Sequence, residues 1–202
     1  MRKAELARKT AETDIVLTLA LDDKGVPEIS TPVGFLSHML ELFSRHSGIS
    51  LKLKVAGDIQ VDAHHTVEDT GIVLGKALYD ALGDKKGIVR YGSIMMVMDE
   101  VRCDVAVDLG GRANLVYNVP RLDLGFSEEE NGYPFDFSLI KEFMKAVSDN
   151  LKATIHIEHH SYSANENRHH VAEAVFKGFA RAIAAAVQIK GEDIPSTKGV
   201  LD

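Results

Sequence analysis

Two short segments of the sequence, residues 64–68 and 169–173, each carry paired histidines followed three positions later by a glutamate. On a helix each residue advances about 100°, so the two histidines of a segment lie on opposite sides of the glutamate and diverge. Imidazole and carboxylate groups together suit zinc, manganese, iron or nickel. The divergence indicates two metal positions, or one metal completed from another copy of the motif. The side chains concerned are His64, His65, Glu68, His169, His170 and Glu173.

One such motif has an ordinary explanation as a solvated helix start, with a glutamate near the positive end of the helix dipole. The elements around the motifs argue against that explanation, because they recur in the order β-β-α-β-α. The first set comprises a strand hairpin at 14–21 and 26–30, a helix at 35–46, a strand at 49–56 and a helix at 64–83. The second set comprises strands within 93–111 and at 113–119, a helix at 137–150, a strand at 153–159 and a helix at 169–187.

The recurrence predicts an α/β (α+β) fold made by tandem duplication, with two sheets packed against helices. The halves are expected at 1–88 and 89–202, joined in one compact unit. The paired histidines lie 169 − 64 = 105 residues apart, whereas the turns 22–25 and 108–111 lie 86 apart. The difference of 19 residues predicts an insertion in the second half. Residues 120–136, rich in Pro, Gly and acidic residues, have the composition of such a loop.

Duplication also pairs His38, which lies 26 residues before His64, with Glu142, which lies 27 before His169. Both side chains can bind a metal ion. Taken alone, His38 reads as a core histidine and Glu142 as a solvent-facing charge. His46 ends the same predicted helix as His38, and is either a substrate contact or a C-terminal cap that complements the helix dipole.

The composition limits the classes of partner. The 202 residues carry a formal net charge of −7, which argues against nucleic acid and anionic membranes as partners. No apolar run approaches the length of about 18 residues that a membrane span needs. Cys103 is the single cysteine, so no intrachain disulfide is possible, and a reducing cytoplasmic location is expected.

A bound anion would therefore need a local basic cluster. Lys177 lies about 80° around its helix from His169, within reach of a ligand at the metal face. Arginine suits a bidentate grip on phosphate, and a small hydroxyl with a lysine completes such a clamp. The candidate phosphate clamp consists of Arg90, Arg112, Lys177, Ser196 and Lys198.

These motifs, taken in order along the chain, resemble the imidazoleglycerol-phosphate dehydratase family. The matching segments are "HMLELFSRH", "HHTVEDTGI", "RYG", "MDE", "GR", "HHVAEAVFKGFARA" and "PSTKGVL". The resemblance implies a manganese-dependent lyase of histidine biosynthesis that removes water from imidazole glycerol phosphate to give imidazole acetol phosphate. It also implies two Mn²⁺ per active site and sites at the subunit interfaces of a large symmetric homo-oligomer, about two dozen subunits in the family.

The resemblance also implies roles for individual residues. Its metal ligands fall on His38, His64, His65, Glu68, His169, His170 and Glu173, with Glu142 where a histidine is common. Its substrate contacts fall on Glu12, His38, His46, His64, Glu68, Arg90, Arg112, His169, Lys177, Ser196 and Lys198. The candidates for acid/base catalysis are Glu12, Glu68 and Glu173, with Asp99 as a supporting residue.

The implied chemistry agrees with the motifs. The proton next to the imidazole is weakly acidic, so the ring must accept charge when the proton leaves, and two metal positions suit one flat ring. Two other classes of function remain open from the residues alone. One is a different metal-dependent lyase or hydrolase acting on a phosphorylated small molecule. The other is a noncatalytic metal-binding assembly protein, which the candidate phosphate clamp argues against.

Overall fold

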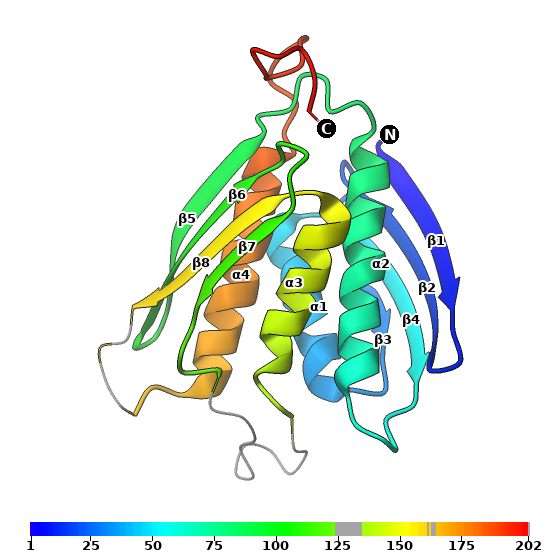
Figure 1. The fold of residues 1–202 in the computed structure, drawn as a ribbon, viewed down its shortest axis with the longest axis vertical. Coiled ribbons are helices and arrows are strands. Elements are labelled where there is room, and N and C mark those ends of the chain that lie inside the picture. The colour runs from blue at the N-terminus through cyan, green and yellow to red at the C-terminus, as the bar shows by residue number, and fades with distance from the viewer. Residues whose placement is uncertain (124–134, 161, 163–164, 202) are drawn as a thin grey trace.

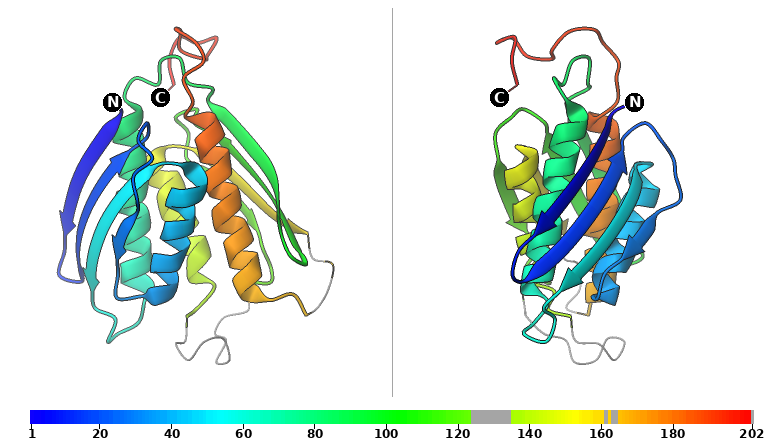
Figure 2. Two further views of the ribbon diagram at one scale, coloured as in Figure 1. Left: turned by 180° about the vertical axis from the view of Figure 1, so that it is seen from behind. Right: turned by 90° about the vertical axis from the view of Figure 1, so that its right-hand side faces the viewer.

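Four helices lie between two four-stranded sheets in the computed structural model, which describes residues 1–123, 135–160, 162 and 165–201 (Figure 1). Seen from behind and from the side, the sheets form the outer layers and the helices the middle one (Figure 2). Apolar residues alternate along the central strands, so one face of each sheet packs on the helices and the other is open to solvent. None of the described helices is long and apolar enough to cross a membrane.

The first sheet has the strand order β1-β2-β4-β3, with β3 parallel to β4. Its elements are β1 (Lys3–Lys9), β2 (Thr13–Ala20), β3 (Glu28–Ser30), α1 (Gly34–Ser47), β4 (Ser50–Gly57) and α2 (His64–Leu82). The second sheet has the equivalent order β5-β6-β8-β7, with β7 parallel to β8. Its elements are β5 (Tyr91–Met98), β6 (Val101–Asp108), β7 (Asn114–Asn118), α3 (Leu139–Leu151), β8 (Thr154–His160) and α4 (Arg168–Ala186).

The predicted α+β class, with two sheets packed against helices in a duplicated unit, is confirmed. Each unit has three strands before its first helix where the predicted order had two. In the first unit the charged N-terminal segment forms β1, and in the second the stretch predicted within 93–111 forms two strands, β5 and β6. In β1 the buried Ala4 and the partly buried Leu6 alternate with charged residues that face water. That arrangement is typical of an edge strand, whose charges oppose pairing with another chain.

The predicted hairpin between residues 14–21 and 26–30 is wrong. Strand β2 pairs antiparallel with β1 on one side and with β4 on the other, so no edge of β2 is left for β3. Strand β3 pairs with β4 instead, in the parallel direction. Turn-forming residues between two apolar runs therefore predicted where the chain reverses, but not which strand pairs with β3.

The strand register gives the offset between the two halves. Leu17 of β2 pairs with Leu53 of β4, and Val105 of β6 pairs with Ile157 of β8. Positions of β2 therefore recur in β6 after 105 − 17 = 88 residues, and positions of β4 recur in β8 after 157 − 53 = 104 residues. Strand β7 follows β3 by 88 as well, which places the 104 − 88 = 16 extra residues between β7 and α3. The expected 19 residues were too many by three. Two of them arise because the turns used for the count are offset by 86 and not 88, and the third lies between β8 and α4, since the paired histidines are offset by 105 and not 104. Residues 124–134 of the predicted insertion lie outside the described part of the chain.

One cluster of buried apolar side chains runs through both sheets and all four helices. Cys103 is fully buried in it, as expected for a small core residue. All strands of the first sheet precede residue 58, and all strands of the second follow residue 90. The division into halves at residue 88 remains a prediction about folding units, because the core is shared.

The helices pair across the two halves: α1 packs on α4, and α2 packs on α3. Two glycines allow α2 and α3 to approach closely. A Cβ atom on Gly71 would lie 2.8 Å from the carbonyl oxygen of Phe143, and one on Gly75 would lie 2.7 Å from that of Val147. The cross-half pairing brings helix α1 of the first half beside the second histidine motif.

We expect Gly75→Ala to lower the free energy of unfolding by about 1–3 kcal/mol, because the added methyl meets backbone that can move only with the whole of α3. Urea denaturation measures the effect. Gly34→Ala is the matched control, since a Cβ there has nothing within 4 Å, and it should be neutral. Equal losses in the two variants would contradict the close-approach argument.

Candidate metal centre and active site

Helices α1 and α4 bring two imidazoles and a carboxylate together at one end of the molecule. His38 comes from α1, while His169 and Glu173 lie one turn apart on α4. Glu173 Oε1 lies 2.9 Å from His38 Nε2 and 3.1 Å from His169 Nε2. One ligand atom from each residue lies within 4.8 Å of the other two, so these three side chains form a candidate metal centre. The donor set of two imidazoles and a carboxylate fits manganese and other first-row divalent ions.

Lys177 and His46 extend this group. Lys177 Nζ lies 2.7 Å from Glu173 Oε2. Burial raises the pKa of Glu173, but hydrogen bonds from Lys177 and His38 outweigh it and hold that pKa at about 2. Burial, followed by the positive charge of Lys177, lowers the pKa of His46. The lowered pKa favours the neutral ring of His46, which lies close enough to Lys177 and Glu173 for their charges to act on it.

The second histidine of each motif points elsewhere. His65 Nδ1 lies 3.0 Å from Asp58 Oδ2, and its Nε2 lies 3.6 Å from Glu12 Oε1. The hydrogen bond with Asp58 raises the pKa of His65. His170 Nδ1 lies 3.0 Å from a carboxylate oxygen of Glu100. The structure thus separates the histidines of each motif as the helical geometry predicted.

The first motif has a looser arrangement than the second. His64 Nε2 lies 3.7 Å from Glu68 Oε2, and both side chains are more than two-fifths exposed. Glu142, the predicted counterpart of His38, is exposed on the first turn of α3. Among the described residues, two groups of side chains lie close enough to hold an ion: His38, His169 and Glu173, and Asp99, Glu100 and His170. Glu142 belongs to neither group.

The register nevertheless supports the equivalence of Glu142 and His38. Ser44 donates a hydrogen bond to the carbonyl of Ile49 at the end of α1, and Ser148 donates the same bond to Ala153 at the end of α3. The offset is 148 − 44 = 104, and 38 + 104 = 142. In the candidate metal centre, His38 faces Glu173. Around the first motif, Glu142 takes the position that corresponds to His38, so this group has a second carboxylate besides Glu68. Two like charges oppose close approach.

Glu100 is a candidate functional residue that the sequence interpretation missed in favour of its neighbour Asp99. The strand offset identifies it, since 12 + 88 = 100 makes it the counterpart of Glu12 in the turn between the first two strands of its half. Asp99 Oδ2 lies farther from His170 Nδ1, at 3.8 Å, and its side chain is 69% exposed. The segment "MDE" contains Glu100, but its correspondence to Glu12 follows only from the strand offset of 88.

The three histidines of β8 are further imidazoles in the half that carries Glu142, and their surroundings differ. His159 is buried, with Nε2 3.1 Å from Glu166 Oε2. His160 Nε2 lies 2.9 Å from Asp104 Oδ2. His156 is exposed on the outer face of the sheet. None of these histidines belongs to a candidate metal group among the described residues.

The candidate phosphate clamp is divided between the two ends of the molecule. The N-terminal ends of α2 and α4 and the turns β1–β2 and β5–β6 lie at the bottom of Figure 1, whereas the C-terminal segment lies at the top. Arg90 is at the C-terminal end of the helices, where it binds Asp108 and donates to the carbonyl of Pro195. A helix of 19 residues, such as α4, is about 28 Å long. Arg90, Ser196 and Lys198 are therefore far from the histidine motifs of the same chain, while Lys177 lies beside them.

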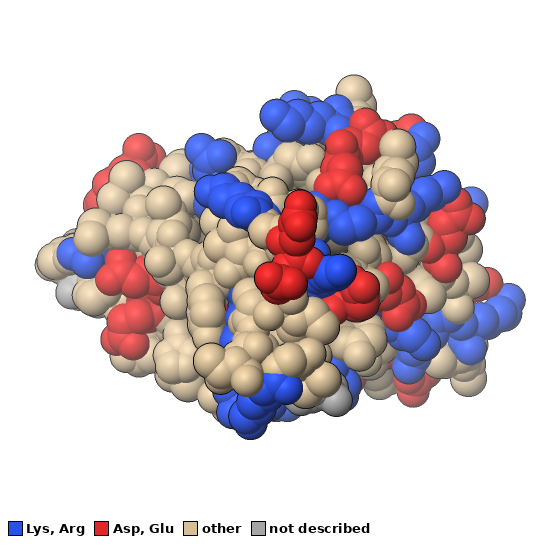
Figure 3. Space-filling model, turned by 90° about the horizontal axis from the view of Figure 1, so that it is seen from above, with Lys and Arg blue, Asp and Glu red and all other residues tan. Residues whose placement is uncertain are grey.

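Arg112 and Lys198 are exposed, and Ser196 Oγ accepts a hydrogen bond from the backbone of Lys198. Figure 3, which looks onto this end of the molecule, shows basic and acidic side chains intermixed. The basic residues there are local rather than part of a broad positive face, in agreement with the net charge of −7.

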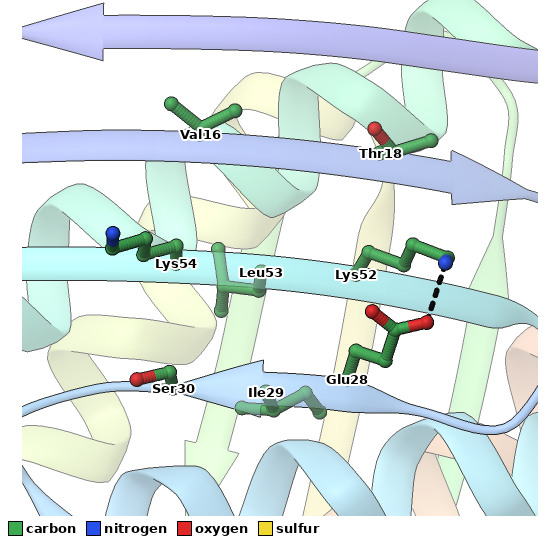
Figure 4. Close-up of a pocket in the computed structure, with 8 residues that line it drawn as sticks. All are labelled: Val16, Thr18, Glu28, Ile29, Ser30, Lys52, Leu53 and Lys54. Carbon is green, nitrogen blue, oxygen red and sulfur yellow. Dashed lines mark hydrogen bonds and ion pairs between the residues drawn. The ribbon is translucent and has the colours of Figure 1, made fainter.

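A shallow groove on the outer face of the first sheet is separate from all of these residues. Figure 4 shows its lining side chains on β2, β3 and β4, with the helices behind the sheet. Lys52 and Glu28 form an ion pair at its edge. None of the predicted site residues lines the groove, so its position does not bear on the chemistry.

Comparison with known proteins identifies the family. Residues 31–183 match the family model described as imidazoleglycerol-phosphate dehydratase. The chain belongs to this family. Its relatives of that name from Endomicrobium trichonymphae and Oceanobacillus iheyensis are 48% and 47% identical over 202 and 203 residues, covering 99% and 100% of this chain and 98% and 100% of theirs. As the motifs predicted, the protein is a hydro-lyase of histidine biosynthesis.

Two solved structures of the family agree with the fold. The enzyme from Staphylococcus aureus has a TM-score of 0.79 at 37% identity, over 93% of this chain and 99% of that one. The enzyme from Pyrococcus furiosus has a TM-score of 0.77 at 35% identity, over 97% and 100% of the two chains. The duplicated three-layer arrangement of this family member is therefore shared with crystal structures.

The low pKa of Glu173 predicts how metal-free protein responds to acid. Its pKa falls from 4.5 to about 2 on folding, so the carboxylate contributes stability above pH 4.5 that is lost as the pH falls toward 2. The contribution is on the order of 3 kcal/mol. Urea denaturation should therefore show wild type more stable than Glu173→Gln at about pH 7, with the gap narrowing by about pH 3. A gap that is constant over this range would contradict the assignment.

Proposed function

We propose that the protein dehydrates imidazole glycerol phosphate to imidazole acetol phosphate using two manganese ions per active site. The observation that carries the metal proposal is the convergence of His38, His169 and Glu173 within 4.8 Å across the two halves of the chain. Divalent ions at the site would supply the Lewis acidity that lets the imidazole ring accept charge. His64, Glu68 and Glu142 would contribute to a second metal position. His65 and His170 would be further metal ligands, and their side chains point away from both of these groups.

The carboxylates differ in a way that separates their roles. Glu173 has a partner on each of its oxygens and a pKa of about 2, which suits a permanently ionised ligand. Glu12 is half exposed and faces His65 Nε2, where a substrate can reach it. We therefore assign proton transfer to Glu12, with Glu68 as the alternative, and a supporting role to Asp99.

Lys177 would bind the substrate beside the metal centre, and His46 would contact it from α1. Arg90, Arg112, Ser196 and Lys198 would hold the phosphate. Because Arg90, Ser196 and Lys198 lie at the opposite end of the helices from the histidine motifs, a complete site requires a second copy of the chain. We accordingly propose a symmetric homo-oligomer with sites at its subunit interfaces. A cytoplasmic location remains an expectation from the single cysteine.

Chelated protein should lose dehydration of imidazole glycerol phosphate, and added Mn²⁺ should restore it, because the site offers only imidazole and carboxylate ligands. Product formation measures turnover, and light scattering of the same samples measures the assembly. Calcium is the control ion, since it prefers sites built from oxygen ligands alone. Full turnover in metal-free protein, or a fully active monomer, would contradict the corresponding part of the proposal.

Glu142 is the predicted ligand most in need of a test. Glu142→Ala should remove one of two equivalents of bound Mn²⁺, and Glu142→His should restore it with a shifted preference toward softer ions. Metal analysis after gel filtration measures the stoichiometry. His156→Ala on the exposed face of β8 is the control and should keep both equivalents. Full occupancy in Glu142→Ala would show that Glu142 only faces solvent.

A further inference from the structure

The outer histidines of the two motifs, His65 and His170, share one feature that the inner ones lack. Each presents its Nδ1 to a carboxylate oxygen at 3.0 Å, from Asp58 in the first half and from Glu100 in the second. The inner histidines His64 and His169 instead present Nε2 to the glutamate of their own motif, at 3.7 Å from Glu68 Oε2 and 3.1 Å from Glu173 Oε1.

This contact decides the position of the ring proton. An ionised carboxylate can only accept a hydrogen bond, so the Nδ1 that faces it must carry the proton. In a neutral imidazole the lone pair is then on Nε2, and that nitrogen alone can bind a metal ion. Nε2 of His65 faces outward toward Glu12 at 3.6 Å, away from Asp58.

We propose that Asp58 and Glu100 are positioning residues, which hold His65 and His170 with Nδ1 protonated so that Nε2 of each ring is available to a metal ion. The proposal rests on the proposed function, in which both histidines are ligands. Carboxylates that hold the distal nitrogen of a ligand histidine fix its orientation and raise its basicity.

The two positioning carboxylates are not related by the duplication. Asp58 lies just after β4, and its counterpart by the offset of 104 is Tyr162, which has no carboxylate. Glu100 lies in the β5–β6 turn and corresponds to Glu12. The two halves therefore reach the same histidine geometry with carboxylates from different elements, which is unexpected if the contacts were only inherited from a common ancestor of the halves.

Glu100 is tied more tightly than Asp58. One oxygen of Glu100 accepts from the backbone N–H of Asn167, the N-cap of α4, at 2.9 Å, and the other faces His170. The Asn167 hydrogen bond, followed by the one from His170, lowers the pKa of Glu100 to about 2. Asp58 uses Oδ2 for His65, while its buried Oδ1 has no hydrogen-bond partner among the described residues.

This difference predicts opposite results for the same amide substitution. In Glu100→Gln the carbonyl oxygen must accept from Asn167, so the NH₂ group faces His170 Nδ1 and draws the ring proton to Nε2. In Asp58→Asn the side chain can turn its oxygen toward His65, because the other position has no partner to satisfy. Glu100→Ala removes both hydrogen bonds and leaves the ring free to adopt either tautomer.

The test is Mn²⁺ affinity, measured by the electron paramagnetic resonance signal of free Mn²⁺ during titration of each full-length variant. Glu100→Gln should bind the affected equivalent about 10- to 100-fold more weakly than wild type, and more weakly than Glu100→Ala. Asp58→Asn should remain near wild type, while Asp58→Ala loses about 10-fold. Asp104→Asn, which alters the partly buried Asp104–His160 pair of the second sheet, is the matched control and should match wild type.

The order of the variants separates the explanations. If Glu100 were itself a metal ligand with Asp99 and His170, Glu100→Ala would bind at least as weakly as Glu100→Gln, and the proposal would be overturned. Wild-type affinity in both Glu100→Gln and Asp58→Ala would also overturn it, while leaving the metal-dependent function intact. Absence of Mn²⁺ binding by the wild-type protein would instead refute the proposed function.

Discussion

The pairing of helices across the two halves is the constraint on which the rest of the structure depends. Helices α1 and α4 share a buried face, and so do α2 and α3, because each helix has one apolar side for its sheet and another for a helix of the opposite half. Had each half packed on itself, His38 would lie beside His64. The cross-half pairing places it against Glu173 instead, and so creates a group of candidate metal ligands that neither half contains alone.

Charge organises the site once packing has placed it. The candidate metal centre combines two imidazoles with one carboxylate, and hydrogen bonds from Lys177 and His38 hold Glu173 ionised although it is largely buried. The group around His64 and Glu68 has Glu142 where the candidate metal centre has His38. Its side chains lie further apart and are more exposed. The duplicated scaffold therefore carries two chemically different sets of candidate ligands, as expected when only the backbone and the apolar positions are constrained.

The candidate metal ligands and most of the candidate phosphate clamp lie at opposite ends of the helices. The candidate ligands gather at the N-terminal ends of α2 and α4, and Arg90 with the C-terminal segment lies at the other end (Figure 1). No side chain spans a 19-residue helix, so the proposed function, in which both groups act on one substrate, requires a second copy of the chain. Under that proposal, assembly is part of the site rather than an addition to it.

The sequence by itself determined the class of fold, most element bounds and the paired histidine motifs, because helix and strand periodicities and ligand spacings are local properties. The ends of α1 and α2 at Gly48 and Gly83 were predictable for the same reason. Only the tertiary structure decided that β3 pairs with β4, that β1 exists as a charged edge strand, and that Glu100 rather than Asp99 holds His170. Those features depend on strand register and on contacts between distant segments, which no local pattern of residues specifies.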